Sequence, residues 1–214
     1  MIVTQVPMDN EFLSNCYLVR DKKTGQCALV DPGGFTDGVK LVSETEKDNL
    51  KYILLTHGHF DHILGVPHAK KITGALIAIG KDDAACLESR EKNLMDTFEV
   101  DADLYPCKAD ILLEDGDIVR IGESELKVMS APGHSEGGVI FIDEDSRSIF
   151  SGDTLFYSTV GRTDTYGGDD LKLRETLKRI IALEGDYTVY PGHGPETVLS
   201  HERTRNIYIR RMSR

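Results

Sequence analysis

Four side chains of types that bind metal ions fall within residues 57–62 of the sequence: His57, His59, Asp61 and His62. Alternate side chains of an extended segment share a face, so His57 and His59 can bind one metal ion. If the chain then turns into a helix, Asp61 and His62 can point at a second ion beside the first. Because three of the chain's seven histidines occur here, the cluster predicts a metal site rather than a solvated turn.

Three further candidates stand in short loops later in the chain. His134 lies in the segment APGHS at 131–135, and His193 lies in the segment YPGHG at 190–194. Both follow runs with β-strand composition, and both have glycine neighbours that permit tight backbone paths. Asp153, in FSGDT at 150–154, also ends such a run. Alone it would be read as a turn or helix-capping residue, but with the histidines it indicates a common site.

The elements that must position these residues alternate between short apolar runs and helical patterns. We expect strands at 16–19, 27–30, 52–56, 74–79, 118–121, 126–129, 139–142, 148–150 and 188–190, and helices at 36–48, 62–73, 171–183 and 195–213. Pro67 fits near the start of a helix or at a kink. The order of strands followed by a helix occurs twice. It predicts an α/β fold in which two sheets pack face to face with helices outside, which is a four-layer αββα sandwich. No linker divides the chain, so we expect a single domain over residues 1–214.

The composition excludes several classes of partner. The net charge of −11 argues against a nucleic acid, and no apolar run approaches the ~20 residues that span a membrane. The first ten residues do not have the pattern of a signal peptide. The four cysteines form no C-x-x-C pair, so we expect reduced thiols and a cytoplasmic protein. The oligomeric state stays open.

Taken together and in order, the pattern H-x-H-x-D-H, then H, D and H, resembles the metallo-β-lactamase superfamily. The resemblance covers the chain from the segment NCYLV at 15–19 to His193. Within the superfamily the chain is most similar to the small glyoxalase II-like proteins, the hydroxyacylglutathione hydrolases. The motifs that carry this similarity are APGHS at 131–135, SGDTLF at 151–156, GRTD at 161–164 and PGHG at 191–194. The resemblance implies the metallo-β-lactamase fold.

The resemblance also implies a role for each candidate ligand. It assigns His57, His59 and His134 to a first metal ion, Asp61, His62 and His193 to a second, and Asp153 to a bridging position. It therefore implies two metal ions per chain, with zinc expected and iron or manganese as alternatives. The implied reaction is the hydrolysis of a small-molecule thioester by a metal-bound hydroxide, in which Asp61 and Asp153 also have catalytic roles.

Some features depart from the better-known relatives. The β-lactamases of this superfamily lack the bridging aspartate and often use a cysteine at the second metal ion, so Asp153 argues against antibiotic hydrolysis. Full-length glyoxalase II enzymes carry a C-terminal helical extension that contacts glutathione, and this sequence shows no counterpart after His193. The resemblance therefore supports the reaction class better than the thiol carrier. We expect Arg162 and Asp164 to form a buried pair that braces the site, with a direct substrate contact as the alternative.

Three other functions fit parts of the pattern. A persulfide dioxygenase would bind a single iron, for which His57, His134 and Asp153 could serve. A lactonase would need a tyrosine such as Tyr157 near the substrate carbonyl. A metal-binding protein without catalytic activity is disfavoured by the complete set of seven ligands. The segment 81–110 is expected either to cover the site as a lid or to pack its scattered hydrophobic residues on the core.

Overall fold

Two six-stranded sheets form the centre of the molecule in the computed structural model, which describes residues 1–9, 12, 14–103 and 106–212. The first sheet has the order β1-β2-β3-β4-β5-β6, with bounds Ile2–Val6, Cys16–Arg20, Cys27–Val30, Leu50–Leu55, Leu76–Gly80 and Ile111–Leu113. The second has the order β14-β13-β10-β9-β8-β7, with bounds Thr197–Val198, Thr188–Pro191, Ser148–Gly152, Val139–Asp143, Ser124–Ser130 and Ile118–Ile121. A short hairpin of β11 (Leu155–Phe156) and β12 (Thr159–Val160) lies beside the second sheet.

The central strands are apolar on both faces because each face is covered. In β4, Ile53 and Leu55 belong to the cluster that packs under the outer helices, whereas Leu54 belongs to the cluster between the sheets. In β9, Phe141 likewise faces the first sheet and Ile140 faces away from it. This alternation follows from the two-residue period of a strand.

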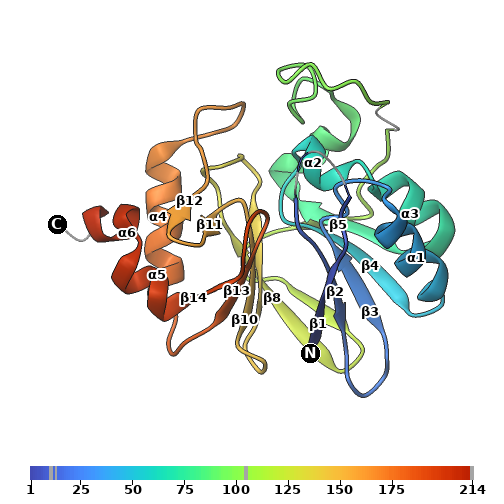
Figure 1. The fold of residues 1–214 in the computed structure, drawn as a ribbon, viewed down its shortest axis with the longest axis horizontal. Coiled ribbons are helices and arrows are strands. Elements are labelled where there is room, and N and C mark those ends of the chain that lie inside the picture. The colour runs from blue at the N-terminus through green and yellow to red at the C-terminus, as the bar shows by residue number, and fades with distance from the viewer. Residues whose placement is uncertain (10–11, 13, 104–105, 213–214) are drawn as a thin grey trace.

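Helices cover the outer face of each sheet and complete the expected four layers (Figure 1). Helices α1 (Asp37–Thr45) and α3 (Val66–Thr73) pack on the first sheet, and α4 (Asp170–Ile181), α5 (Leu199–Arg205) and α6 (Ile207–Met212) lie against the second. The prediction of an αββα sandwich is confirmed.

Two of the predicted helices differ from the structure. The expected helix at 62–73 is divided into α2 (Phe60–Ile63) and α3, with Pro67 in the first turn of α3. The expected single helix at 195–213 is wrong. Residues 195–196 form no helix, Thr197 and Val198 pair with β13, and α5 and α6 follow with a break at Asn206. Residue 213 lies outside the described residues.

The break between α5 and α6 has a local cause at Asn206. Its backbone is extended (φ −64°, ψ 118°). Its side-chain oxygen accepts hydrogen bonds from the backbone N–H groups of Tyr208 and Ile209, and its amide donates to Glu202. Asn206 therefore caps the start of α6, a role for which short polar residues are preferred.

The segment 81–110 begins with the 3₁₀-helix η1 (Lys81–Glu88) and rises above α2 (Figure 1, green). Leu94, Met95 and Val100 pack around Phe60 of α2, so these residues form a small core of their own. Phe98 is 48% exposed. Residues 104–105 of the segment lie outside the described residues. Leu87 of the segment packs in the core beneath the outer helices, as the packing alternative expects, and the role of the segment as a lid stays a prediction.

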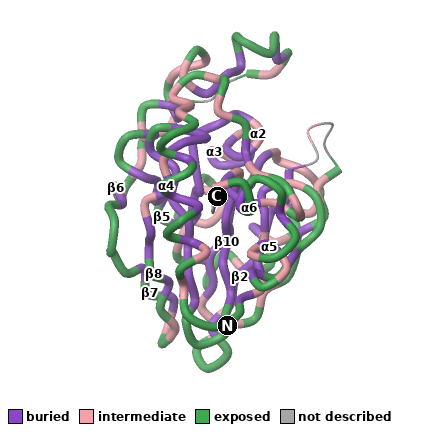
Figure 2. Tube along the Cα trace, turned by 90° about the vertical axis from the view of Figure 1, so that its left-hand side faces the viewer, coloured by how far each residue is buried: buried purple, intermediate pink, exposed green. Residues whose placement is uncertain are grey.

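The polar loops gather at one edge of the two sheets. Strands β3, β4, β5 and β6 are parallel, so their carboxyl ends share an edge. A backbone hydrogen bond from Val139 N to Thr56 O (2.7 Å) joins this edge to the second sheet. Central strands such as β10 are buried, whereas outer strands such as β7 are partly exposed (Figure 2). Within residues 1–9, 12, 14–103 and 106–212, no helix is long and apolar enough to cross a membrane.

Candidate metal centre

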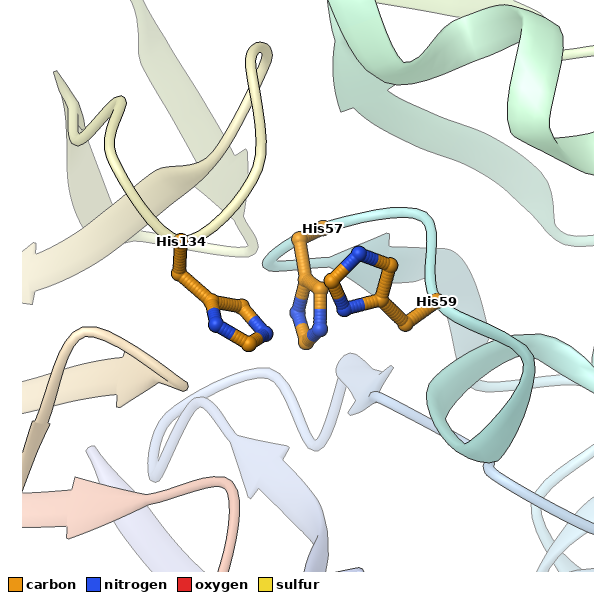
Figure 3. A group of neighbouring side chains, drawn as sticks. All are labelled: His57, His59 and His134. Carbon is orange, nitrogen blue, oxygen red and sulfur yellow. The ribbon is translucent and has the colours of Figure 1, made fainter. Parts of the chain in front are cut away.

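His57, His59 and His134 come from two loops and point toward one another (Figure 3). We call them the three-histidine set. The first two lie between β4 and α2, and His134 lies between β8 and β9. Ring centroids are 4.6 Å apart for His57 and His59, 4.6 Å for His59 and His134, and 4.9 Å for His57 and His134. One nitrogen from each ring lies within 4.8 Å of the other two, a spacing at which three imidazoles can share an ion.

Asp61, His62 and His193 form a second group, which we call the mixed set. Helix α2 begins at Phe60 and carries Asp61 and His62. His193 follows β13 and brings its Nε2 to 3.1 Å from Asp61 Oδ2, and His62 Nε2 lies 3.6 Å from the same oxygen. Nitrogen and carboxylate donors at this spacing suit a second metal ion.

Asp153 lies between the two sets. Its Oδ2 is 3.5 Å from His134 Nε2, in the three-histidine set, and 3.5 Å from His193 Nε2, in the mixed set. Its Oδ1 is 3.4 Å from His62 Nε2. One carboxylate thus reaches both sets, which is the position that a bridging ligand requires.

Gly192 makes room for this arrangement. A Cβ atom at residue 192 would lie 2.1 Å from Asp153 Oδ1 and 2.8 Å from His62 Cε1. Any side chain at this position would therefore displace one of the two. The glycine before His193 is explained by this close approach rather than by turn formation alone.

The two sets differ in protonation. Burial, together with the neighbouring histidines, holds the pKa of His57 well below its usual value, and burial and His134 lower the pKa of His59 to about 3. Burial also lowers the pKa of His62, but Asp61 and Asp153 outweigh it and raise that pKa well above the usual value. Burial lowers the pKa of His193 as well, but the hydrogen bond to Asp61 and the charges of Asp153 and Asp61 together outweigh it and raise that pKa. His57 and His59 are therefore neutral near pH 7, whereas His62 carries a proton that a metal ion would displace.

The residues present fit bound metal ions. His57 Nε2, His59 Nε2, His134 Nε2 and Asp153 Oδ1 are buried and make no hydrogen bond among the described residues. Buried polar atoms without partners cost free energy and are uncommon. His57 Nδ1 lies 3.1 Å from Thr56 Oγ1, and His134 Nδ1 lies 2.8 Å from Arg162 O, which leaves each Nε2 facing the centre of the set. Such bonds orient metal-binding histidines. The assignment of the seven residues as ligands stays a prediction.

Asp31 supports both sets and was not identified from the sequence. Its Oδ1 accepts from Thr56 N at 2.8 Å, and its Oδ2 accepts from Thr56 Oγ1 at 2.6 Å. Oδ2 is also 3.1 Å from His62 Nδ1. The signal in the sequence was a carboxylate directly after the buried strand β3, at the same sheet edge as His57.

The prediction that Arg162 and Asp164 form a buried pair is wrong about the burial. The ion pair forms (2.7 Å), but the two side chains are 53% and 71% exposed. The Arg162 guanidinium lies 5.7 Å from the ring centroid of Phe98, so it contacts the segment above the site instead. Support for the site comes from the backbone carbonyl of Arg162, which accepts the hydrogen bond of His134 Nδ1.

Tyr157, which the lactonase interpretation would use, packs elsewhere. Its ring stacks on His201 of α5 with centroids 4.9 Å apart and an interplanar angle of 15°. This contact holds the ring against the C-terminal helices. It gives the lactonase interpretation no support.

Comparisons with known proteins agree with the fold. The family model of the metallo-beta-lactamase superfamily matches residues 9–193. Hydroxyacylglutathione hydrolase GloC of Haemophilus influenzae is 29% identical over 208 residues, which are 92% of this chain and 93% of that protein. The BLEG-1 B3 metallo-beta-lactamase superposes with a TM-score of 0.88 at 29% identity, covering 97% of this chain and 99% of that one. TTHA1623, solved in a di-iron-bound form, superposes with a TM-score of 0.82 at 32% identity. The match covers 95% of this chain and 98% of that one.

Proposed function

The chain belongs to the metallo-beta-lactamase superfamily, and we propose that it is a binuclear metal-dependent hydrolase that cleaves thioesters of the hydroxyacylglutathione type. The observation that carries the proposal is the position of Asp153, which reaches both the three-histidine set and the mixed set. A site for a single ion would not need the second group of donors. The similarity to a hydroxyacylglutathione hydrolase supports the choice of substrate class.

Bound metal ions would supply an activated water and a Lewis acid for the thioester carbonyl. The residues of the chain hold and orient the reacting groups. Asp61 lies against His193 and is 15% exposed at its side chain, so its carboxylate can also reach an incoming water and hold the proton that the water loses. The buried histidines exclude bulk water, which strengthens charge interactions at the reacting carbonyl.

The proposed entrance lies between the segment above α2 and the loop after β12. Phe98 and Arg162 face each other there, and both are about half exposed. An apolar ring and a cation suit a short acyl group attached to an anionic carrier. With a net charge of −11, the chain as a whole does not attract such a carrier. We therefore propose weak discrimination among thiol carriers.

Two other activities need to be separated by experiment. One structural relative, BLEG-1, is named as a B3 metallo-beta-lactamase, whereas the carboxylate of Asp153 near both sets supports the bridging assignment that argues against this activity. A single-iron dioxygenase would use His57, His134 and Asp153 and leave the mixed set without a function. Because counterparts of His62 and His193 are present in such dioxygenases too, the mixed set alone does not separate the two activities, and the assay of oxygen consumption does.

The test uses chelator-treated protein reconstituted separately with zinc, manganese or ferrous iron. Each form is assayed for thiol release from lactoyl-glutathione, for oxygen consumption with glutathione persulfide, and for opening of a chromogenic cephalosporin. We expect thiol release that returns with metal and is lost in Asp153→Asn. Oxygen consumption or β-lactam hydrolysis without thiol release would overturn the proposal.

A further inference from the structure

Asp83 is a buried carboxylate outside the seven candidate ligands. It lies in η1 and is 2% exposed. Its Oδ2 accepts hydrogen bonds from Gly58 N at 3.0 Å and from Ser135 Oγ at 2.7 Å. Its Oδ1 accepts from Gly137 N at 2.6 Å. All three partners are donors, so an ionised carboxylate satisfies them together.

The partners of Asp83 belong to the two loops that form the three-histidine set. Gly58 stands between His57 and His59, in the loop after β4 of the first sheet. Ser135 directly follows His134, and Gly137 lies two residues later, in the loop between β8 and β9 of the second sheet. One side chain thus connects ligand loops that come from different sheets.

The backbones of these loops approach η1 too closely for other side chains. A Cβ atom at residue 137 would lie 2.2 Å from Asp83 N. At residue 58 it would lie 2.4 Å from Cys86 Cβ, one turn further along η1. The two glycines let η1 dock against both loops, which brings Asp83 within hydrogen-bonding distance of each.

We propose that Asp83 is a positioning residue that fixes the separation of His134 from His57 and His59. The proposal rests on the proposed metal centre. It assigns Asp83 a role in the three-histidine set alone, since its contacts reach neither Asp61 nor His193. Small errors in ligand position weaken a metal site, and partners that orient ligands typically contribute about 10- to 100-fold in affinity.

An amide cannot replace this carboxylate. Oδ1 and Oδ2 each face a backbone N–H, so in either orientation the NH₂ group of an asparagine would meet a donor. Asp83→Asn keeps the size of the side chain and removes one of these bonds. Asp82→Asn makes the same chemical change at an exposed neighbour in η1 and is the matched control.

The experiment titrates metal-free protein with cobalt(II) and follows both affinity and the visible absorption bands, which report ligand geometry. We expect Asp83→Asn to bind the tighter ion about tenfold or more weakly, with altered bands, while Asp82→Asn matches the wild type. Thermal unfolding of the metal-free variants is measured in parallel. An affinity within twofold of Asp82→Asn, with unchanged bands, would overturn the proposal even if the variant were less stable.

A second variant covers the case in which Asp83→Asn does not fold. Ser135→Ala removes one of the three hydrogen bonds and leaves both backbone partners in place, so we expect a smaller loss in the same direction. If it binds cobalt as tightly as Asp82→Asn does, the proposal fails. Because no substrate is used, a wild type that binds cobalt but cleaves no thioester would refute the proposed function alone.

Discussion

Asp61 Oδ2 lies 3.1 Å from Nε2 of His193, a residue 132 positions later in the chain. The first comes from α2 beside the first sheet and the second from the loop after β13 of the second sheet. The contact therefore exists only when the two sheets are packed together. The centre is a property of the whole sandwich, and each half supplies ligands that the other half completes.

Asp153→Ala should remove more metal than His193→Ala. Asp153 reaches both sets, so its loss leaves each ion with too few ligands, whereas His193 belongs to the mixed set alone. We expect fewer than one ion per chain in Asp153→Ala and about one in His193→Ala, measured by elemental analysis. Near-normal loading of Asp153→Ala would contradict the bridging assignment.

Asp61→Asn should lower kcat far more than it changes KM. The asparagine can still accept a hydrogen bond at this position but cannot hold the proton of the attacking water. A loss of about 100-fold or more in kcat is expected, because general acid–base groups contribute about 10²- to 10⁴-fold. The loss in kcat is measured by steady-state kinetics with lactoyl-glutathione. An unchanged kcat would show that Asp61 only stabilises the first turn of α2.

Metal binding to the mixed set should release a proton from His62 near pH 7, whereas His57 and His59 should release none. Burial lowers the pKa of His57 and His59, so these rings are already neutral, whereas Asp61 and Asp153 raise the pKa of His62 despite its burial. A proton on His62 competes with the ion, so the affinity for the second ion should rise as pH rises from 6 to 8.

This prediction is checked by calorimetric zinc titrations in two buffers with different ionisation enthalpies. The heat of the first binding event should contain no proton from His57 or His59 and should depend less on the buffer than the second. The heat of the second should shift by at least one proton's ionisation enthalpy. Proton release on the first event alone would contradict this difference in protonation between the three-histidine set and the mixed set.

Arg162→Ala should leave the metal content unchanged. The side chain is 53% exposed and contacts Asp164 and Phe98, whereas His134 is held by the backbone carbonyl, which the substitution keeps. We expect a higher KM with metal content equal to that of the wild type. Loss of an ion from this variant would show that the side chain of Arg162 does brace the metal site.

The candidate ligands that the structure brings together could be identified from the sequence because their spacing reflects local geometry. His57 and His59 alternate in an extended segment, and His134 and His193 follow strands at glycines. Asp31 and Asp83 could not be predicted in the same way. Their partners are backbone N–H groups and loop side chains 25 to 54 residues away, and such bonds leave no periodic pattern in the sequence.

The central strands of the sheets were predictable for the same reason, whereas the short edge strands β6 and β14 and the C-terminal helices were not. Buried strands such as β4 and β9 show continuous apolar runs, which are typical of strands covered on both faces. The break at Asn206 depends on its hydrogen bonds to Glu202 and to the first turn of α6. A single polar residue within a helical pattern does not by itself indicate a break.

The number of metal ions that each chain binds distinguishes a binuclear centre from a site for a single ion. The wild type is purified without chelator, and a portion is stripped and reconstituted, before elemental analysis alongside Asp153→Ala. We expect close to two ions per wild-type chain, because the carboxylate of Asp153 lies near both sets of donors. A wild type that holds one ion or none after reconstitution would contradict this expectation.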